Sequence, residues 1–255
     1  MKQPGQSLPH LTVSNTQLRN RMIFSFAIFI VLLVAGWMLF NHIKSAPKDA
    51  GTQKPLRAVL NANEKFFSAT FDSSKLVKEY PVSEAVKNVR VNGNVGLRDS
   101  IDAATWRLEV VRNTGDTLHI TLDAIKALPK RDVVFDFKCI EGWSQITHWA
   151  GVPLKTFMEH YGLKGEEGMK YVGLQTPDKK YYVGIDMPSA LQPQTLLCYE
   201  MNGKPLPLDQ GFPLRLIIPV KYGIKHLKRI GTLFFANERP ADYWAERGYD
   251  YYAGH

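Results

Sequence analysis

The sequence predicts an α+β domain, rich in short strands, that follows one membrane-spanning helix. The segment from Met22 to Phe40 contains no charged side chain and no polar face. Beyond residue 56, short β-rich segments alternate irregularly with short helical ones, and long helices are few. This pattern favours a mixed α+β fold over a doubly wound parallel sheet.

The apolar segment has the length of a bilayer span. At about 1.5 Å per residue, Met22–Phe40 extends roughly 28 Å, close to the thickness of the hydrocarbon layer. We predict an N-terminal tail at residues 1–21 and a transmembrane helix at 22–43. A cleaved signal peptide is one alternative, although its apolar core of roughly 7–15 residues is shorter. A buried core helix is the other, although it would carry a polar face.

The basic residues around the span give a weak indication of its orientation. Arg19 and Arg21 precede it without any acidic residue, and lysines follow it at 44, 48 and 54. Basic residues concentrate on the cytoplasmic side, and here the two sides nearly tie. We favour a cytoplasmic N-terminus, an inner-membrane anchor and a periplasmic or otherwise extracytoplasmic domain.

The polar residues 44–56, which include Pro and Gly, predict a flexible linker before a single domain at 57–255. Within the domain, Thr121 is expected to cap a helix over 122–128. Pro153 is expected to open a helix that ends before Gly162, and Asn202-Gly203 predicts a hairpin. Strands are predicted at 106–112, 132–138, 171–175, 181–185, 196–201, 214–220 and 230–236.

Composition excludes several classes of protein. The whole chain carries a net charge of +8, and residues 44–255 carry 29 basic and 24 acidic residues. This excess is too mild to indicate nucleic-acid binding by itself. Only Cys139 and Cys198 are present, which excludes a disulfide framework but permits one disulfide between them. Neither a CxxC nor an HExxH motif occurs, so we expect no structural zinc site.

Cys139 is the most informative single residue. It follows the predicted strand 132–138 and precedes the turn sequence Glu141-Gly142-Trp143-Ser144. Such a turn would present a thiolate at the end of a strand, and thiolates are ligands for molybdenum, copper or zinc. A buried, inert thiol is the alternative. Cys198 lies inside an apolar strand, and we predict that it belongs to the core.

A basic stretch follows in the C-terminal third of the chain. Residues 210–237 contain no acidic residue, and they include His226 and the five basic residues Arg215, Lys221, Lys225, Lys228 and Arg229. Clusters of this kind bind phosphates or acidic partners. A strand with solvated lysines is the alternative. A membrane-tethered nucleic-acid binder is a further hypothesis that depends on this stretch alone.

The two stretches together resemble a known family. Three segments within them are similar to the molybdopterin-binding domain of the sulfite oxidase family, and in particular to sulfoxide reductase catalytic subunits. These segments are the Cys139 turn, the run Gly211-Phe212-Pro213-Leu214-Arg215-Leu216 and the run from Pro219 to Lys225. The resemblance extends from about Asn61 to the C-terminus. It implies a mixed, β-rich sulfite oxidase-type fold.

The resemblance also implies the residues of a cofactor site. Cys139 would be the catalytic residue and the molybdenum ligand, and Arg215 would bind the phosphate end of the pterin. Gln210 stands where many relatives carry His or Asn, and its amide can still donate a hydrogen bond. The further residues implied are Asn63, Phe66 and Phe67 in an entry segment, Thr176 as a hydroxyl donor, and His226, Leu227 and Lys228 as a source of backbone amides and an ammonium group.

Aromatic residues near these motifs are predicted to serve packing. Trp143, Trp149 and Trp244 are expected in the core. The segment from Glu238 to Tyr249 resembles the end of the family domain. It is expected to pack on the core, and a docked helix covering the site is the alternative.

The function implied by the resemblance is that of a membrane-anchored oxidoreductase that uses molybdenum-molybdopterin. It would transfer an oxygen atom to or from a small substrate such as a sulfoxide or an oxyanion. A membrane cytochrome or a quinone-linked protein would exchange electrons with it, because the sequence carries no ligand set for haem or an iron–sulfur cluster. The alternative is a cofactor-free, extracytoplasmic ligand-binding or scaffold module on the same fold.

Overall fold

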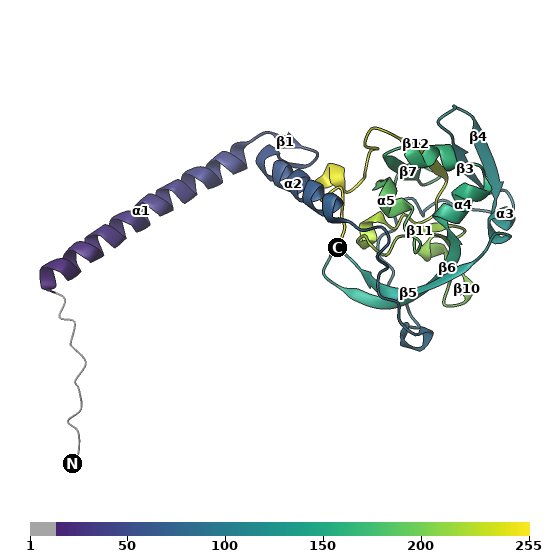
Figure 1. Ribbon diagram of the computed structural model, residues 1–255, viewed down its shortest axis with the longest axis horizontal. Coiled ribbons are helices and arrows are strands. Elements are labelled where there is room, and N and C mark those ends of the chain that lie inside the picture. The colour runs from purple at the N-terminus through teal and green to yellow at the C-terminus, as the bar shows by residue number, and fades with distance from the viewer. Residues whose placement is uncertain (1–13) are drawn as a thin grey trace, which may run out of the picture. The chain divides into compact units, whose positions relative to one another are not determined.

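The computed structural model describes residues 14–255 (Figure 1). This chain divides into two compact units. One reaches to Lys48 and takes in Gln53–Pro55, and the other consists of Asp49–Thr52 and Leu56–His255. Residues 1–13 of the predicted N-terminal tail lie outside the described part.

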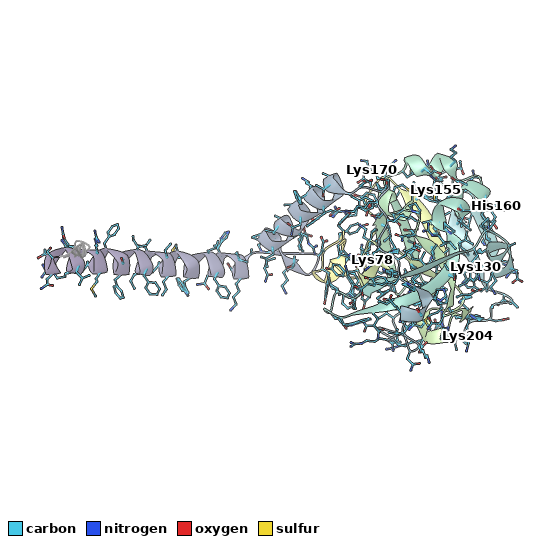
Figure 2. The ribbon with its side chains drawn as sticks, turned by 60° about the horizontal axis from the view of Figure 1, so that its bottom comes forward. Lys78, Lys130, Lys155, His160, Lys170 and Lys204 are labelled. Atoms are coloured by element: carbon cyan, nitrogen blue, oxygen red, sulfur yellow. The ribbon has the colours of Figure 1, made fainter. Side chains whose placement is uncertain are left out.

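The first unit is dominated by α1 (Asn15–Ser45), which contains the predicted span. Ser14 caps it and forms a reciprocal capping box with Gln17, so the helix begins seven residues before the predicted position 22. No residue of α1 is buried, and its side chains surround the helix without packing partners (Figure 2). The interpretation as a buried core helix is therefore wrong. By length and composition, with a mean hydropathy of 2.7, α1 can cross a membrane.

The predicted linker at 44–56 contains secondary structure. Two short strands, β1 (Lys48–Asp49) and β2 (Thr52–Gln53), flank a turn in which Ala50 and Gly51 have φ angles of 44° and 80°. A helix, α2 (Lys54–Thr70), begins directly afterwards. Neither α2 nor the turn was predicted, because Pro and Gly among polar residues indicated a linker and the helical spacing of Leu56, Val59, Phe66 and Phe67 was overlooked.

The domain is built on two five-stranded sheets (Figure 1). The first is antiparallel and contains β5 (Arg131–Lys138), β6 (Ser144–Pro153), β9 (Leu196–Met201), β10 (Lys204–Pro205) and β11 (Arg215–Ile217). The second is mixed and runs in the order β4 (Thr117–Thr121), β3 (Arg107–Val111), β12 (Thr232–Ala236), β7 (Tyr171–Gln175) and β8 (Tyr182–Asp186). The predicted α+β class is confirmed.

Short helices connect the strands, and several local predictions are confirmed. Thr121 caps α3 (Leu122–Lys126) by accepting a hydrogen bond from Ala124, and Pro153 precedes α4 (Leu154–His160). Asn202 and Gly203, with φ angles of 51° and 70°, join β9 to β10 in the predicted hairpin. The remaining helical elements are α5 (Met187–Ala190) and the 3-10 turns η1 (Val82–Glu84), η2 (Lys164–Gly168), η3 (Leu208–Gln210), η4 (Gly223–Lys225) and η5 (Ala245–Arg247).

The alternation of side chains along β9 and β11 separates two hydrophobic clusters. Leu197 and Leu216 belong to the main core, which joins both sheets. Cys198 and Ile217 point to the other face, into a smaller cluster that contains Trp149. Because successive side chains of a strand point to opposite faces, this pattern also places Arg215, two residues before Ile217, on the face of the smaller cluster.

The basic stretch is not a solvated surface. Arg215, Lys221, Lys225 and Arg229 are each less than 5% exposed. The exposed basic residues labelled in Figure 2 are spread across the domain instead of gathering in one patch. The expectation of solvated lysines is therefore wrong for this stretch, and the burial of these residues does not favour the nucleic-acid hypothesis.

Candidate functional site

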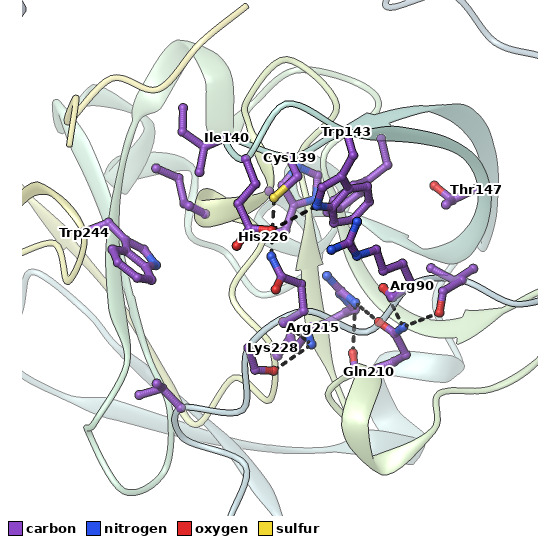
Figure 3. Close-up of a pocket in the computed structure, with 18 of the residues that line it drawn as sticks. Arg90, Cys139, Ile140, Trp143, Thr147, Gln210, Arg215, His226, Lys228 and Trp244 are labelled. Atoms are coloured by element: carbon purple, nitrogen blue, oxygen red, sulfur yellow. Dashed lines mark hydrogen bonds between the residues drawn. The ribbon is translucent and has the colours of Figure 1, made fainter.

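A cavity of about 370 Å³ lies beside the carboxyl end of β5 (Figure 3). Its wall comes from segments that are far apart in the sequence. They are residues 89–95, the turn after β5, one face of β6, β11, the η4 region and the aromatic C-terminal segment. The fold therefore brings the predicted Cys139 turn and the predicted basic stretch to the same cavity.

Cys139 stands where β5 ends, as predicted. Its amide donates to the Trp143 carbonyl at 2.9 Å, and the Gly142 amide donates to the Cys139 carbonyl at 3.1 Å. Gly142 has a φ of 87°, a conformation that favours glycine, and this closes the tight turn. The sulfur of Cys139 accepts a hydrogen bond from Asn92 Nδ2 at 3.4 Å, and the residue lines the cavity.

Cys198 is a core residue, as predicted. It is fully buried in the smaller cluster, and its thiol lies 3.2 Å from the carbonyl oxygen of Glu200. Burial raises the pKa of this thiol to about 12, so it remains protonated at neutral pH. The two cysteines thus occupy different chemical environments, and both are free thiols.

Alternate residues of the β5–β6 turn and of β6 form one wall. Trp143, Gln145, Thr147 and Trp149 are spaced by two, so they share a face, and all four line the cavity. The guanidinium of Arg90 lies 4.7 Å from the centre of the Trp143 ring. Trp149 is buried in the core as predicted and also lines the cavity, whereas the half-buried Trp143 belongs mainly to the cavity wall.

Arg215 is a buried cation without an anionic partner. Its Nη1 donates to the backbone carbonyl and the side-chain oxygen of Gln210 at 3.0 and 2.9 Å, and its guanidinium lies 4.5 Å from the Trp149 ring. Nε has no hydrogen-bond partner, and no described carboxylate forms an ion pair with it. Burial lowers the pKa of Arg215 to about 10. Such a charge is costly, so the site is suited to an anionic ligand.

Lys228 and Gln210 hold the segment at residues 89–93 against the cavity. Lys228 Nζ donates to the carbonyls of Asn92, Gly93 and Asp209 at 2.7, 3.1 and 2.9 Å. Gln210 Nε2 donates to the carbonyls of Val89 and Arg90. Burial, followed by the charge of Arg215, lowers the pKa of Lys228 to about 7.

His226 lines the cavity through its ring and does not present a hydrogen-bond donor to it. Nδ1 accepts from the Ile218 amide, and Nε2 lies 3.1 Å from the Lys221 carbonyl, which assigns the proton to Nε2. Its ring centre lies 4.6 Å from that of Phe137. Burial, followed by the charge of Arg215, lowers the pKa of His226 to about 3, so the ring is neutral.

The aromatic C-terminal segment forms the remaining wall. Tyr243, Trp244 and Tyr249 line the cavity, whereas packing on the core had been favoured over the alternative of a segment that covers the site. Asp242 fixes the segment, because it accepts from the amides of Trp244 and Ala245 and forms a buried ion pair with Lys225. The segment is therefore packed on the domain and also bounds the site.

The structure brings five of the predicted site residues to the cavity: Cys139, Gln210, Arg215, His226 and Lys228. Asn63, Phe66 and Phe67 do not line it, because they lie on exposed faces of α2. Thr176 lies outside the wall, where its hydroxyl accepts from the amide of Tyr181 and donates to Asp178. The side chain of Leu227 lies in the main core, and its amide donates to the Lys225 carbonyl.

Sequence reasoning missed the segment that carries Arg90, Asn92 and Gly93. The predicted entry segment was placed at Asn61–Phe67, but Asn92 is the asparagine near the Cys139 sulfur. One local signal was present. Asn92-Gly93 is a turn dipeptide, and Gly93 adopts a φ of 68°.

Comparison with known proteins identifies the family to which the chain is similar. The sequence model of a family described as "oxidoreductase molybdopterin binding domain" matches residues 94–244. A protein of Azospira oryzae with the provisional name protein-methionine-sulfoxide reductase subunit YedZ1 is 38% identical over 81% of this chain and 78% of its own length. The protein-methionine-sulfoxide reductase catalytic subunit MsrP of Campylobacter jejuni is 29% identical over 62% of this chain and 59% of that protein. Mitochondrial sulfite oxidase of Rattus norvegicus is 29% identical over 59% of this chain and 32% of that protein.

Proposed function

This chain belongs to the family of molybdopterin-binding oxidoreductases, and we propose that it is membrane-anchored and transfers an oxygen atom to or from a small substrate. In this proposal Cys139 is the molybdenum ligand, and the cavity holds molybdenum-molybdopterin. Arg215 carries the proposal furthest, because it is a buried cation that faces a cavity and has no anion of its own.

The residues present fit an anionic cofactor. Arg215 and Lys228 lie on one side of the cavity, and Nε of Arg215 is a buried hydrogen-bond donor without an acceptor. Glu141 is the one acidic residue that lines the cavity, and it is exposed to solvent. A phosphate group beside Arg215 would offset the buried charge and supply the missing acceptor.

Cys139 would supply a protein sulfur at the other end of the same cavity. Asn92 donates to this sulfur at 3.4 Å, and both residues line the cavity. When bound, the cofactor supplies oxygen-atom transfer coupled to a two-electron change at the metal. The chain supplies the thiolate, the charges that hold the phosphate end, and a partly apolar cavity that limits access of water.

The aromatic wall supports a sulfoxide as the substrate more than an oxyanion. Trp143, Tyr243, Trp244 and Tyr249 all line the cavity. Thioether sulfur makes favourable contacts with aromatic rings, and Arg90 beside Trp143 can donate to a sulfoxide oxygen. The names of the reductases similar to this chain point to the same substrate class.

The rest of the chain supports a proposal about location and electron supply. We propose that α1 anchors the protein in the inner membrane with the domain on the periplasmic side. No cluster of three or more metal-binding side chains occurs among residues 14–255, so electrons would come from a separate membrane cytochrome or quinone-linked protein. A cofactor-free binding module is not favoured, because the matching family model and the named relatives are those of molybdopterin-binding oxidoreductases.

Metal content tests the proposal. Full-length protein purified from a molybdenum-replete host should contain about one molybdenum per chain together with pterin. Cys139→Ser should lower the molybdenum content sharply, whereas Cys198→Ala, which removes the other buried thiol, should retain it. Folded wild-type protein without molybdenum or pterin would refute the proposal.

A further inference from the structure

The helix α2 turns its polar side toward the domain. Arg57 is 7% exposed and donates to the carbonyls of Ala50, Ala245 and Tyr249 at 2.7–2.9 Å. Glu64, seven residues later on the same face, forms an ion pair with Arg239 at 2.6 Å. The contacts that hold α2 on the domain are thus largely polar.

Another face of α2, turned away from Arg57 and Glu64, is apolar and exposed. Leu56, Val59, Phe66 and Phe67 are 41%, 57%, 64% and 53% exposed. Their helical spacing places them on one side, and the two phenylalanine rings pack edge to face with centres 5.3 Å apart. This arrangement is the reverse of that in an ordinary surface helix, whose apolar stripe faces the core. An exposed apolar stripe of this kind, here interrupted by Asn63, marks an interaction surface.

The position of α2 in the chain indicates what covers this face. The apolar helix α1 ends at Ser45 and α2 begins at Lys54, so the connection can extend over at most about 30 Å. If α1 spans the bilayer, α2 must remain near its surface. The only acidic residue of α2 is Glu64, which is engaged by Arg239, so the exposed face bears no charge that anionic lipids would repel.

We propose that α2 is an interfacial helix whose apolar face, formed by Leu56, Val59, Phe66 and Phe67, inserts into the lipid surface. This inference rests on the proposed role of α1 as an anchor. Interfacial helices bury such faces roughly 5–10 Å into the boundary between headgroups and acyl chains. Lipid is favoured over a protein partner because the short connection to a bilayer span constrains α2 whether or not a partner is present.

The contacts of Arg57 give this docking a consequence for the active site. The carbonyls of Ala245 and Tyr249 that it binds flank the turn that follows Trp244, and Trp244 and Tyr249 line the cavity. Docking of α2 would therefore hold this wall of the cavity near the membrane surface. A membrane-bound electron donor would meet the domain on that side.

Photocrosslinking of the full chain tests the proposal. p-Benzoylphenylalanine replaces Phe66 in one variant and Lys65 in the matched control, since Lys65 is also exposed but points to another side of the helix. A third variant carries the probe in place of Leu33, inside α1. Each variant is reconstituted in nanodiscs of phosphatidylethanolamine and phosphatidylglycerol, irradiated, and examined by intact mass spectrometry for a mass increase of one phospholipid.

We expect lipid adducts at positions 66 and 33, with a several-fold lower yield at position 65. Equal yields at 65 and 66, with adducts at 33, would overturn the docking of α2 and leave the anchor intact. Absence of adducts at position 33 would overturn the anchor and the docking with it. A protein adduct at position 66 in native membranes, without a lipid adduct, would assign the face to a partner protein and would also overturn the proposal.

Discussion

Two buried basic residues of the same stretch should differ strongly in how the same substitution affects stability. Arg215 and Lys225 are 2% and 1% exposed, but Arg215 has no carboxylate partner and Lys225 is paired with Asp242 at 2.5 Å. We predict that Arg215→Met leaves the stability of the cofactor-free protein almost unchanged. Lys225→Met should destabilise the protein strongly.

The structure gives the magnitude for each variant. Burial shifts the pKa of Arg215 from 12.5 to about 10, which at about 1.4 kcal/mol per unit is an unfavourable free energy of roughly 3 kcal/mol. At pH 7, below both values, the residue is charged when folded and when unfolded, so this cost is fully present. Arg215→Met removes this unfavourable free energy. It also removes the hydrogen bonds to Gln210 and the contact with Trp149, which together contribute about 2–4 kcal/mol, so the two effects roughly cancel. Lys225→Met instead leaves Asp242 buried without its cation, at a cost of about 3–5 kcal/mol.

Urea unfolding of protein from a molybdenum-starved host, followed by tryptophan fluorescence, measures both values. The free energy of unfolding should change by about 1 kcal/mol or less for Arg215→Met and by at least about 3 kcal/mol for Lys225→Met. A loss of stability in Arg215→Met as large as that in Lys225→Met would contradict the claim that the buried charge of Arg215 does not stabilise the fold. It would mean that Arg215 is retained for folding and not for an anionic ligand.

Two further predictions concern a bulge and the half-buried Lys228. Gly151→Ala should lower the free energy of unfolding of the domain, measured in urea, by more than about 2 kcal/mol. The reason is that the added Cβ would lie 2.2 Å from the Leu197 carbonyl oxygen, at the bulge between β6 and β9. A stability equal to that of the wild type would contradict this strand register. Sulfate binding by the cofactor-free protein, measured by calorimetry, should weaken several-fold from about pH 6 to about pH 8. Over this range Lys228, whose pKa is about 7, loses its proton and its positive charge. Arg215 stays charged and His226 stays neutral. Lys228→Met should abolish this pH dependence, and an unchanged slope in that variant would exclude Lys228 as its source.

The sequence predicted the parts of the site that depend on local pattern. The apolar strand before Cys139 and the turn after it are both local signals, and the structure places the cysteine at the end of β5. The hairpin at Asn202-Gly203 and the cap at Thr121 were predictable for the same reason.

The remaining features depend on contacts between distant residues. Lys221 and Lys225 could be interpreted as solvated because their partners, Asp186 and Asp242, lie 35 and 17 residues away. The strand β6 was missed because it mixes polar and apolar residues, one face lining a cavity and the other packing on the core. The similarity of residues 61–67 to an entry segment was misleading, because those residues form part of an exposed helix while Asn92 occupies the cavity.

X-ray absorption at the molybdenum edge is the most direct test of the bond between the metal and Cys139. We predict that the wild-type protein has one more sulfur in the coordination shell of molybdenum than any residual loaded Cys139→Ser protein, and that Cys198→Ala matches the wild type. An identical number of sulfur ligands in wild type and Cys139→Ser would contradict the assignment of Cys139 as the metal ligand.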